Sequence, residues 1–201
     1  MPETALQHLA ERLAAGSVAG PAGVELAEAA FAVKINLRGN AGDEAFRRGV
    51  QSTLGLEPAV QANTFTRNGE MRCLWLGPDE WLIVAASASA GDLAGRLRAA
   101  LAGQHVSVVD VAAAYTVLRM AGERSREVLS KACSLDLHAR SFRPGDCAQS
   151  NFARTQAIVA LEDETPVFHL FVRRSLAQYL AEWLLDAMRE YHVGERRDNA
   201  G

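Results

Sequence analysis

The sequence lacks the residue clusters that usually mark a metal centre or a disulfide framework. Its three cysteines, Cys73, Cys133 and Cys147, are 60 and 14 residues apart, and these spacings match no zinc-binding motif. No two of its five histidines form a His-x-x-x-His pair. An odd number of cysteines without a secretory signal favours reduced thiols. We therefore expect no metal site in this chain.

Long hydrophobic runs and a strong charge of one sign are also missing. No run of about 18 apolar residues exists, which excludes a transmembrane helix. The N-terminus has neither the positive charge nor the apolar stretch of a signal peptide. The formal net charge is −3, and the basic doublets are scattered. We therefore expect a cytoplasmic protein that binds neither membranes nor nucleic acid.

Several isolated residues could carry chemistry, but each has a simpler structural role. Residues 39–42 lack the third glycine of a dinucleotide fingerprint and the Lys-Ser/Thr of a P-loop, so we expect a turn. Asp110 ends an apolar run, where it could act as a general base, cap a turn or pair with an arginine; we favour a structural role. His138 and His169 are each isolated beside apolar residues. Cys147, expected in a loop, has no histidine nearby to activate it.

The acidic residues 162–164 are the last candidates, and we expect them to form a solvated turn between two strands. No segment brings a nucleophile, a base and an orienting group together. The sequence therefore predicts no catalytic, cofactor-binding or metal-binding residue in this chain.

The clearest local structure is a β-hairpin at residues 74–84. Two apolar runs flank a Gly-Pro-Asp-Glu turn, in which Pro78 supplies the fixed φ that a turn requires. Trp75 and Trp81, two of the three tryptophans, bracket this turn. Because large aromatic side chains contribute much of the burial energy, we expect at least one of them to be buried.

The N-terminal segment has helical periodicity, with Thr4 as an expected cap. Its apolar face consists of Leu6, Leu9, Ala10 and Leu13. Residues 16–23 contain three glycines and one proline, so we expect a flexible connection.

The rest of the chain reads as one module written twice, at residues 31–101 and 115–188. Each copy begins with an alternating strand that ends at a glycine, Gly39 or Gly122, and these glycines are 83 residues apart. A helix follows in each copy, and then a short Leu-x-Leu tag at residues 54–56 or 135–137.

Two strands and a closing helix complete each copy. The closing helices carry matching leucines, namely Leu93, Leu97 and Leu101 in the first copy and Leu176, Leu180 and Leu184 in the second. An insertion at residues 139–151 lengthens the second copy.

This order predicts an α+β fold, a duplicated β-α-β-β-α module with mostly antiparallel sheets and helices packed on them. We expect residues 1–23 to form the N-terminal helix and linker, 24–105 the first repeat and 106–193 the second. Residues 194–201 are expected to be a flexible tail, and the two repeats to form one compact duplicated domain.

Several stretches, in order, resemble the γ subunit family of bacterial heterotetrameric sarcosine oxidase. Besides the hairpin, they are residues 35–39, 108–111 with 116–119, 135–138 with 142–149, and 168–175. Together the matches extend over about residues 35–185. The resemblance implies a small non-catalytic subunit that assembles with α, β and δ subunits.

In that family the complex oxidatively demethylates sarcosine to glycine with O2 and produces H2O2. The one-carbon unit becomes formaldehyde or 5,10-methylenetetrahydrofolate. The resemblance further implies that FAD, FMN, NAD and zinc belong to the other subunits, with no cofactor in this chain.

The same family resembles the folate-binding fold of the glycine-cleavage T-protein, an aminomethyltransferase. A free-standing folate-binding protein or one-carbon transferase is therefore the alternative function. The comparable acidic turn here, residues 161–166, lacks the family's glycine and has a proline after it, which argues against folate binding by this chain. The insertion at residues 139–151 has two open interpretations. It could be a contact for the larger subunits, through residues such as His138, Phe142, Arg143 and Gln149, or it could be a solvated loop.

Overall fold

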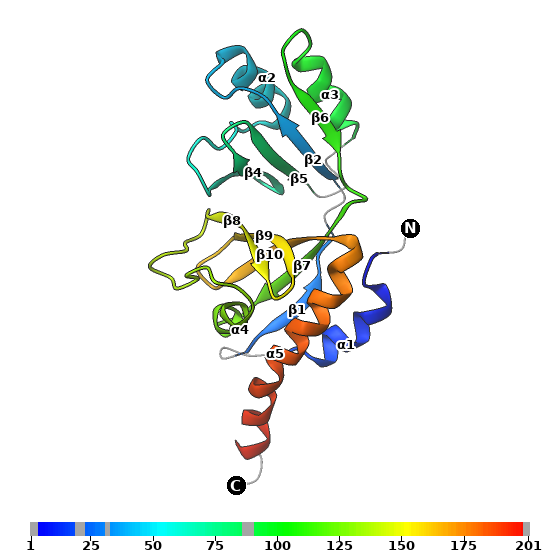
Figure 1. The fold of residues 1–201 in the computed structure, drawn as a ribbon, viewed down its shortest axis with the longest axis vertical. Helices are drawn as coiled ribbons and strands as arrows, with labels where there is room; N and C mark the ends of the chain where they lie inside the picture. Colours follow the sequence, from blue (N-terminus) through cyan, green and yellow to red (C-terminus); the bar gives the residue numbers. More distant parts are fainter. Residues whose placement is uncertain (1–3, 19–22, 31–32, 86–90, 199–201) are drawn as a thin grey trace. The chain divides into compact units, whose positions relative to one another are not determined.

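The computed structural model divides the chain into two compact units, each built on a five-stranded sheet (Figure 1). The structure describes residues 4–18, 23–30, 33–85 and 91–198. The first-repeat unit comprises residues 30–115 and 145–148, and the second-repeat unit comprises residues 1–29, 116–144 and 149–201. Neither unit is a single continuous stretch of the chain.

The first-repeat unit has the sheet order β3-β4-β5-β2-β6. Its elements are β2 (Val33–Arg38), α2 (Glu44–Leu54), β3 (Phe65–Asn68), β4 (Met71–Gly77), β5 (Glu80–Ala85), α3 (Leu93–Ala100) and β6 (Ser107–Asp110). The pairs β2–β5, β2–β6, β3–β4 and β4–β5 are all antiparallel.

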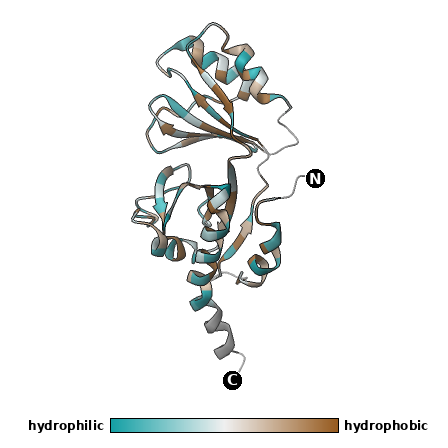
Figure 2. Cartoon of the chain, turned by 45° about the vertical axis from the view of Figure 1, so that its right-hand side comes forward, coloured by the Kyte–Doolittle hydropathy of each residue, from teal (hydrophilic) through white to brown (hydrophobic). Residues whose placement is uncertain are grey.

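The core of this unit lies between the sheet and its two helices. Because side chains alternate along a strand, Ile35 and Leu37 of β2 point to one face, where they join Ile83 of β5. Phe46 of α2 and Leu97 of α3 cover that face and are completely buried. Figure 2 shows the corresponding pattern, with helices that carry both hydrophobic and hydrophilic residues.

Helix α2 begins and ends where its sequence specifies. The Asp43 side chain accepts a hydrogen bond from the Ala45 amide at 2.8 Å and caps the N-terminus. Gly55 ends the helix in the left-handed region, with φ of 69°. Between these caps Gly49 permits close packing, since a Cβ there would lie 2.7 Å from a methyl group of Leu101.

The predicted hairpin is strands β4 and β5, joined by a two-residue turn at Pro78 and Asp79. Trp75 lies opposite Trp81, and a bulge follows in β4 between Trp75 and Gly77. Trp81 is completely buried, its indole N–H donates to the Ala59 carbonyl at 2.7 Å, and its ring centroid lies 5.5 Å from that of Phe46. Trp75 is only half-buried. The expectation that at least one tryptophan is buried is confirmed by Trp81.

The second-repeat unit has the sheet order β1-β7-β10-β9-β8. Its strands are β1 (Glu25–Glu28), β7 (Tyr115–Ala121), β8 (Cys147–Phe152), β9 (Thr155–Leu161) and β10 (Val167–Arg173). Its helices are η1 (Gln7–Leu9), α1 (Ala10–Ala15), α4 (Ser125–Ala132), η3 (Arg174–Leu176) and α5 (Ala177–Asp198).

The long helix α5 has a buried face of Ala177, Leu180, Ala181, Leu184 and Met188. Leu176 was expected on this face, and that expectation is wrong: Leu176 lies in η3 and is 39% exposed. The α-helix begins one residue later, so Ala177 takes the buried position. Helix α5 also includes residues 194–198 of the segment expected as a tail.

Glu28, at the end of β1, fixes the start of the N-terminal helix. Its carboxylate accepts hydrogen bonds from the amides of Ala5 and Leu6, at 3.1 and 3.0 Å. The prediction that Thr4 caps this helix is wrong, because the 3-10 helix starts at Gln7 without a side-chain cap. A carboxylate distant in sequence takes the place of a local cap, because it reaches the same unsatisfied amides.

The ends of the expected flexible connection, residues 16–23, are tied down. Gly16 lies so close to Leu185 that a Cβ would be 2.3 Å from one of its methyl groups. The Ser17 hydroxyl accepts from the Leu26 amide at 3.0 Å, and Val18 forms a β-bridge with Val24. Residues 19–22 lie outside the described part of the chain.

The duplication is confirmed by equivalent hydrogen bonds in the two units. The Gly39 amide donates to the Asp79 carbonyl at 3.0 Å, and the Gly122 amide donates to the Pro166 carbonyl at 3.1 Å. In both units this bond joins the end of the first strand to a hairpin turn. Each copy has one strand more than predicted, because the short strands β3 and β8 precede the two predicted strands.

The two copies exchange their leading strands. Strand β1 precedes the first repeat but pairs with β7 of the second, and β6 precedes the second repeat but pairs with β2 of the first. The exchange is symmetric, since Ala29 N donates to Val117 O and Val111 N donates to Lys34 O, both at 2.8 Å. Each sheet is therefore completed by a strand from the other half of the chain.

Replacing Trp81 by Ala is expected to lower the free energy of unfolding by about 3–5 kcal/mol, because it leaves a cavity in the core and an unpaired Ala59 carbonyl. Trp75→Ala is the matched control and should cost less, since Trp75 is half-buried. Urea denaturation of both variants measures the difference. Equal losses would show that the buried indole has no special role.

A protease site inserted after Gly103 tests the strand exchange. Gly103 is exposed, lies between α3 and β6, and has open space around its Cα. After cleavage, the two fragments should co-elute in native size-exclusion chromatography, because each holds an edge strand of the other's sheet. They should separate in denaturant. Separation under native conditions would mean that the exchanged strands do not hold the halves together.

Candidate functional site

The structure disperses the residues that could have carried chemistry. Asp110 ends β6, is exposed, and accepts a hydrogen bond from the Ala112 amide at 2.8 Å, which is the turn-capping role. Residues 39–43 form the β2–α2 turn, where the Asn40 side chain accepts from the Gly42 amide. Glu28 in β1 is the equivalent of Asp110 in β6. Glu28 lies opposite Leu118, and Asp110 lies opposite Ile35, which is the counterpart of Leu118 in the first copy. Both carboxylates thus bind nearby backbone amides.

A polar triad crosses β2 and β5 beside the hairpin turn. Glu80 accepts from Asn36 Nδ2 at 2.7 Å and from Arg38 Nη2 at 2.6 Å. Burial of the carboxyl opposes ionisation, but the hydrogen bonds from Arg38 and Asn36 outweigh it and lower the pKa of Glu80. With its carboxylate already bound on both sides, this triad orders the hairpin and is not arranged as a proton-transfer site.

The connection from α4 to β8, residues 133–146, contains the expected insertion. It is fourteen residues long, whereas its equivalent in the first repeat, residues 55–64, has ten. Asp136 fixes its first turn by accepting from Ser141 Oγ at 2.6 Å and from the His138 amide at 3.1 Å. These two hydrogen bonds lower the pKa of Asp136. His138 is exposed, and its Nδ1 accepts from the Arg140 amide.

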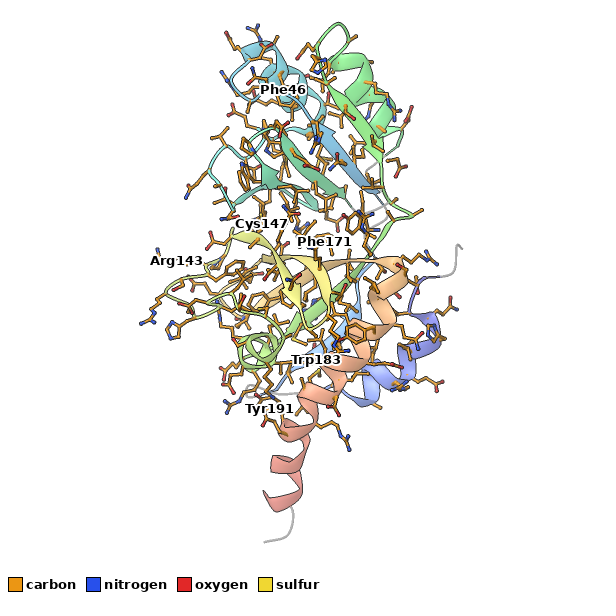
Figure 3. The ribbon with its side chains drawn as sticks, viewed as in Figure 1. Phe46, Arg143, Cys147, Phe171, Trp183 and Tyr191 are labelled. Carbon is orange, nitrogen blue, oxygen red and sulfur yellow. The ribbon has the colours of Figure 1, made fainter. Side chains whose placement is uncertain are left out.

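Arg126 binds the middle of this connection, and sequence reasoning missed it. From α4 its guanidinium donates to the carbonyls of Leu137 and Phe142 and lies 5.5 Å from the centroid of the Phe168 ring. Phe142 is buried and stacks on Phe168, with ring centroids 6.3 Å apart. Phe142 is therefore a core residue of the second-repeat unit, whereas Arg143 lies on the projecting loop (Figure 3).

The end of the insertion is used inside the first-repeat unit. Thr64 and Asp146 form an antiparallel bridge, and the Cys147 amide donates to the Asn63 carbonyl at 2.8 Å. Cys147 was expected in a loop, and this is wrong, because it is the first residue of β8 and is completely buried. Its thiol donates to the carbonyls of Thr64 and Trp75, at 3.2 and 3.6 Å.

The acidic turn at residues 162–164 is only partly solvated. Asp163 and Glu164 are exposed, but Glu162 is 4% exposed and lies 3.2 Å from Nδ1 of His169, which is also buried. The expectation that all three acids are solvated is therefore wrong for Glu162. A contact between the acid and a buried imidazole lowers the cost of burying these two groups, which supports the structural role expected for His169.

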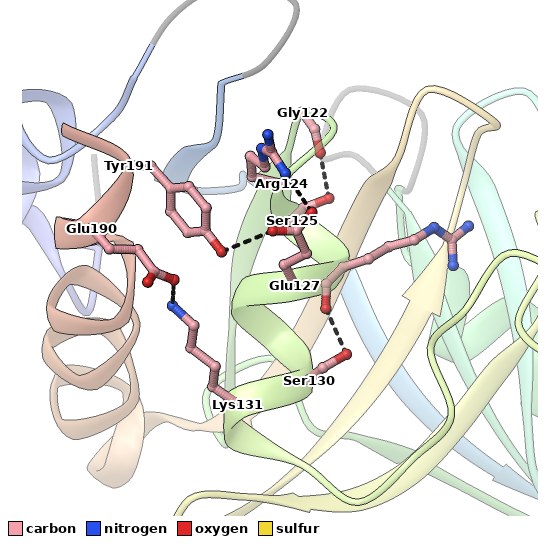
Figure 4. A network of polar contacts seen from close by, with 9 residues as sticks. Gly122, Arg124, Ser125, Glu127, Ser130, Lys131, Glu190 and Tyr191 are labelled. Carbon is pink, nitrogen blue, oxygen red and sulfur yellow. Dashed lines mark hydrogen bonds and ion pairs between the residues drawn. The ribbon is translucent and has the colours of Figure 1, made fainter. Parts of the chain in front are cut away.

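A second polar network joins α4 to α5 (Figure 4). Tyr191 donates to Glu127 at 3.2 Å, and its ring lies between Arg124 and Lys131, which are 5.8 and 4.9 Å from the centroid. Lys131 also pairs with Glu190. Burial and the carboxylates of Glu190 and Glu127 raise the pKa of Tyr191. This network fixes the C-terminal part of α5 against α4 and leaves its charges paired.

The cysteines are unsuited to nucleophilic chemistry. Burial raises the pKa of the Cys73 and Cys147 thiols to about 12, and burial also raises the pKa of half-buried Cys133. All three are free thiols. In the described part of the chain, no three His, Cys, Asp or Glu side chains gather as metal ligands. Over the same residues, no helix is both long and apolar enough to cross a membrane.

The polar side chains thus cap turns, order loops and pair with one another. What the fold offers to other molecules is its surface, including a projecting loop and a few exposed apolar side chains. Those large apolar residues, with their exposed fractions, are Val60 (70%), Val109 (47%), Leu176 (39%) and Tyr179 (36%).

Sequence comparison relates the chain to one family over most of its length. The model of the sarcosine oxidase gamma subunit family matches residues 38–190. The sarcosine oxidase subunit gamma of Corynebacterium sp. (strain P-1) is 34% identical over 188 residues, which is 92% of this chain and 89% of that protein. The sarcosine oxidase subunit gamma of Arthrobacter sp. is 35% identical over 188 residues, which is again 92% of this chain and 89% of that protein.

Structure comparison agrees with the sequence. A chain of the heterotetrameric sarcosine oxidase from Corynebacterium sp. U-96, solved with pyrrole 2-carboxylate, superposes with a TM-score of 0.87 and 29% identity, over 94% of this chain and 95% of that one. Glycine cleavage system aminomethyltransferase T from Bartonella henselae superposes with a TM-score of 0.66 and 15% identity, over 92% of this chain and 57% of that one. At that identity the second likeness shows the fold alone.

A thiol-specific reagent should distinguish the three cysteines. With a pKa of about 12, Cys73 and Cys147 hold on the order of one thiolate in ten thousand at pH 8, and burial also excludes the reagent. The folded chain should therefore release colour from Ellman's reagent through Cys133 alone, and from all three thiols in denaturant. Cys133→Ser should leave a folded chain that is inert. Rapid reaction of two thiols in the folded chain would contradict the buried placement.

Proposed function

The chain belongs to the sarcosine oxidase gamma subunit family, and from this we propose that it is the small, non-catalytic subunit of a heterotetrameric sarcosine oxidase. The observation that carries the proposal is the superposition on a chain of such a complex over nearly the full length of both chains. The complex would oxidatively demethylate sarcosine to glycine with O2, giving H2O2 and either formaldehyde or 5,10-methylenetetrahydrofolate.

In this proposal the reacting groups belong to other subunits. FAD, FMN, NAD and zinc are assigned to the α, β and δ subunits, and this chain contributes no catalytic, cofactor-binding or metal-binding residue. The assignment is supported by the use of Glu28, Asp110 and Glu162 in structural contacts and by the raised pKa of its thiols. A cytoplasmic location is part of the same proposal.

The alternative, a free-standing folate-binding protein or one-carbon transferase, has no specific support. The aminomethyltransferase likeness extends to the fold alone. The turn that would be comparable, residues 161–166, has Glu162 directed to His169 within the unit, which removes one of its acids from solvent.

The proposal predicts which partners the chain carries. A tagged chain purified from its native host should bring larger subunits with it, show flavin absorbance, and produce H2O2 when sarcosine is added. The same chain expressed alone should show no flavin and no oxidation, and serves as the control. Purification from the host without any flavoprotein, or a chain that binds tetrahydrofolate by itself, would overturn the assignment.

A further inference from the structure

The duplication provides an internal comparison that isolates one unusual surface. An offset of 84 residues relates β4 (Met71–Gly77) to β9 (Thr155–Leu161) and the first residue of α3, Leu93, to the first residue of α5, Ala177. Equivalent positions in the two copies can therefore be compared side by side.

At this offset one surface cluster has different residue types in the two copies. In the first copy, the β3–β4 turn has Gly69 and Glu70, and the start of α3 has Asp92 and Gly95, where the Asp92 carboxylate accepts from the Gly95 amide at 2.9 Å. That surface therefore consists of glycines and acidic residues.

In the second copy the equivalents are Ala153, Arg154, Leu176 and Tyr179. This cluster, here called the α5 patch, contains two of the four large apolar side chains that are exposed in the described part of the chain. The other two belong to the first-repeat unit, where Val60 lies in the connection between α2 and β3 and Val109 lies on β6.

The α5 patch is ordered before anything binds to it. The Tyr179 hydroxyl accepts a hydrogen bond from the Arg154 amide at 3.3 Å, so the ring is tied to the β8–β9 turn. Leu176 precedes Tyr179 by three residues at the start of the helix and lies on the same side. In the same turn Ala153 has a φ of 52°, close to the φ of 56° at its equivalent Gly69. Glycine adopts this left-handed conformation without strain, whereas alanine does not. A rigid surface loses little entropy on binding.

The chemistry of the patch indicates its partner. Leu176 and Tyr179 offer apolar contact area, and tyrosine and arginine are enriched at interface anchors. Arg154 is exposed, and no carboxylate of the described residues forms an ion pair with it. Arg173 and Arg174 are also exposed, and only Ser175 separates them from Leu176 in the chain. The patch therefore fits a surface that presents an apolar side chain beside a carboxylate.

We propose that the α5 patch is a docking surface for another subunit of the oxidase, which places an apolar side chain on Leu176 and Tyr179 and a carboxylate on Arg154. This inference rests on the proposed function. A second copy of this chain is a poorer occupant, because a symmetric dimer through the patch would bring like charges together.

The test uses the assembled complex, with the tagged chain co-expressed beside the other subunits. Leu176→Asp and Arg154→Glu give the second copy the residue types of the first. Each should weaken association by about tenfold or more, the loss typical of a central anchor. Val60→Asp and Val109→Asp are matched controls that change apolar residues of the other unit, which are more exposed than Leu176, and both should associate like the unaltered chain.

Thermal melting monitored by circular dichroism checks that all four variants fold, and an acid at the start of a helix is compatible with its dipole. Undiminished association of both patch variants, or an equal loss in the controls, would remove the α5 patch from the interface. Dimerisation of the isolated chain that Leu176→Asp abolishes would assign the patch to a second copy and overturn the proposal. If the unaltered chain itself fails to associate, the proposed function fails instead.

Discussion

The exchange of leading strands is the constraint on which the rest of the structure depends. Strands β1 and β6 have four residues each, and each completes a sheet whose other strands come from the opposite half of the chain. Without them β7 and β2 would each lose the backbone hydrogen bonds on one side and become edge strands, so each half supplies pairing that the other half needs. The exchange also explains why the compact units are discontinuous in sequence and why residues 1–29 belong with the second repeat.

Buried and half-buried charges in this protein serve to position backbone. Glu28 holds the start of the N-terminal helix, and Arg126 holds the connection from α4 to β8 through the carbonyls of Leu137 and Phe142. Glu162 pairs with His169 within the second sheet. Each of these groups is therefore already bound inside its unit, where it stabilises the fold.

The two copies of the module have diverged on their surfaces more than in their frameworks. The hydrogen bonds of Gly39 and Gly122, and those of Ala29 and Val111, have kept equivalent partners. In contrast, the small and acidic residues near the start of α3 are replaced by Leu176, Tyr179 and Arg154 near the start of α5. Since the framework is shared, this difference points to a contact that only the second copy makes.

Local sequence determined much of this protein by itself. Asp43 and Gly55 set the limits of α2, Pro78 set the hairpin turn, and the strand and helix periods revealed the duplicated α+β module, because each of these signals acts through neighbouring residues. The family was also readable from the sequence.

Only the tertiary structure decided which distant residues meet. The strand exchange, the Glu28 cap in place of Thr4, and the Glu162–His169 pair depend on contacts between segments that no local pattern connects. Cys147 and Phe142 changed from loop residues to buried ones for the same reason, and Leu176 became exposed because α5 begins one residue later. Periodicity identifies a face of an element, whereas long-range packing determines what covers that face and what remains open to a partner.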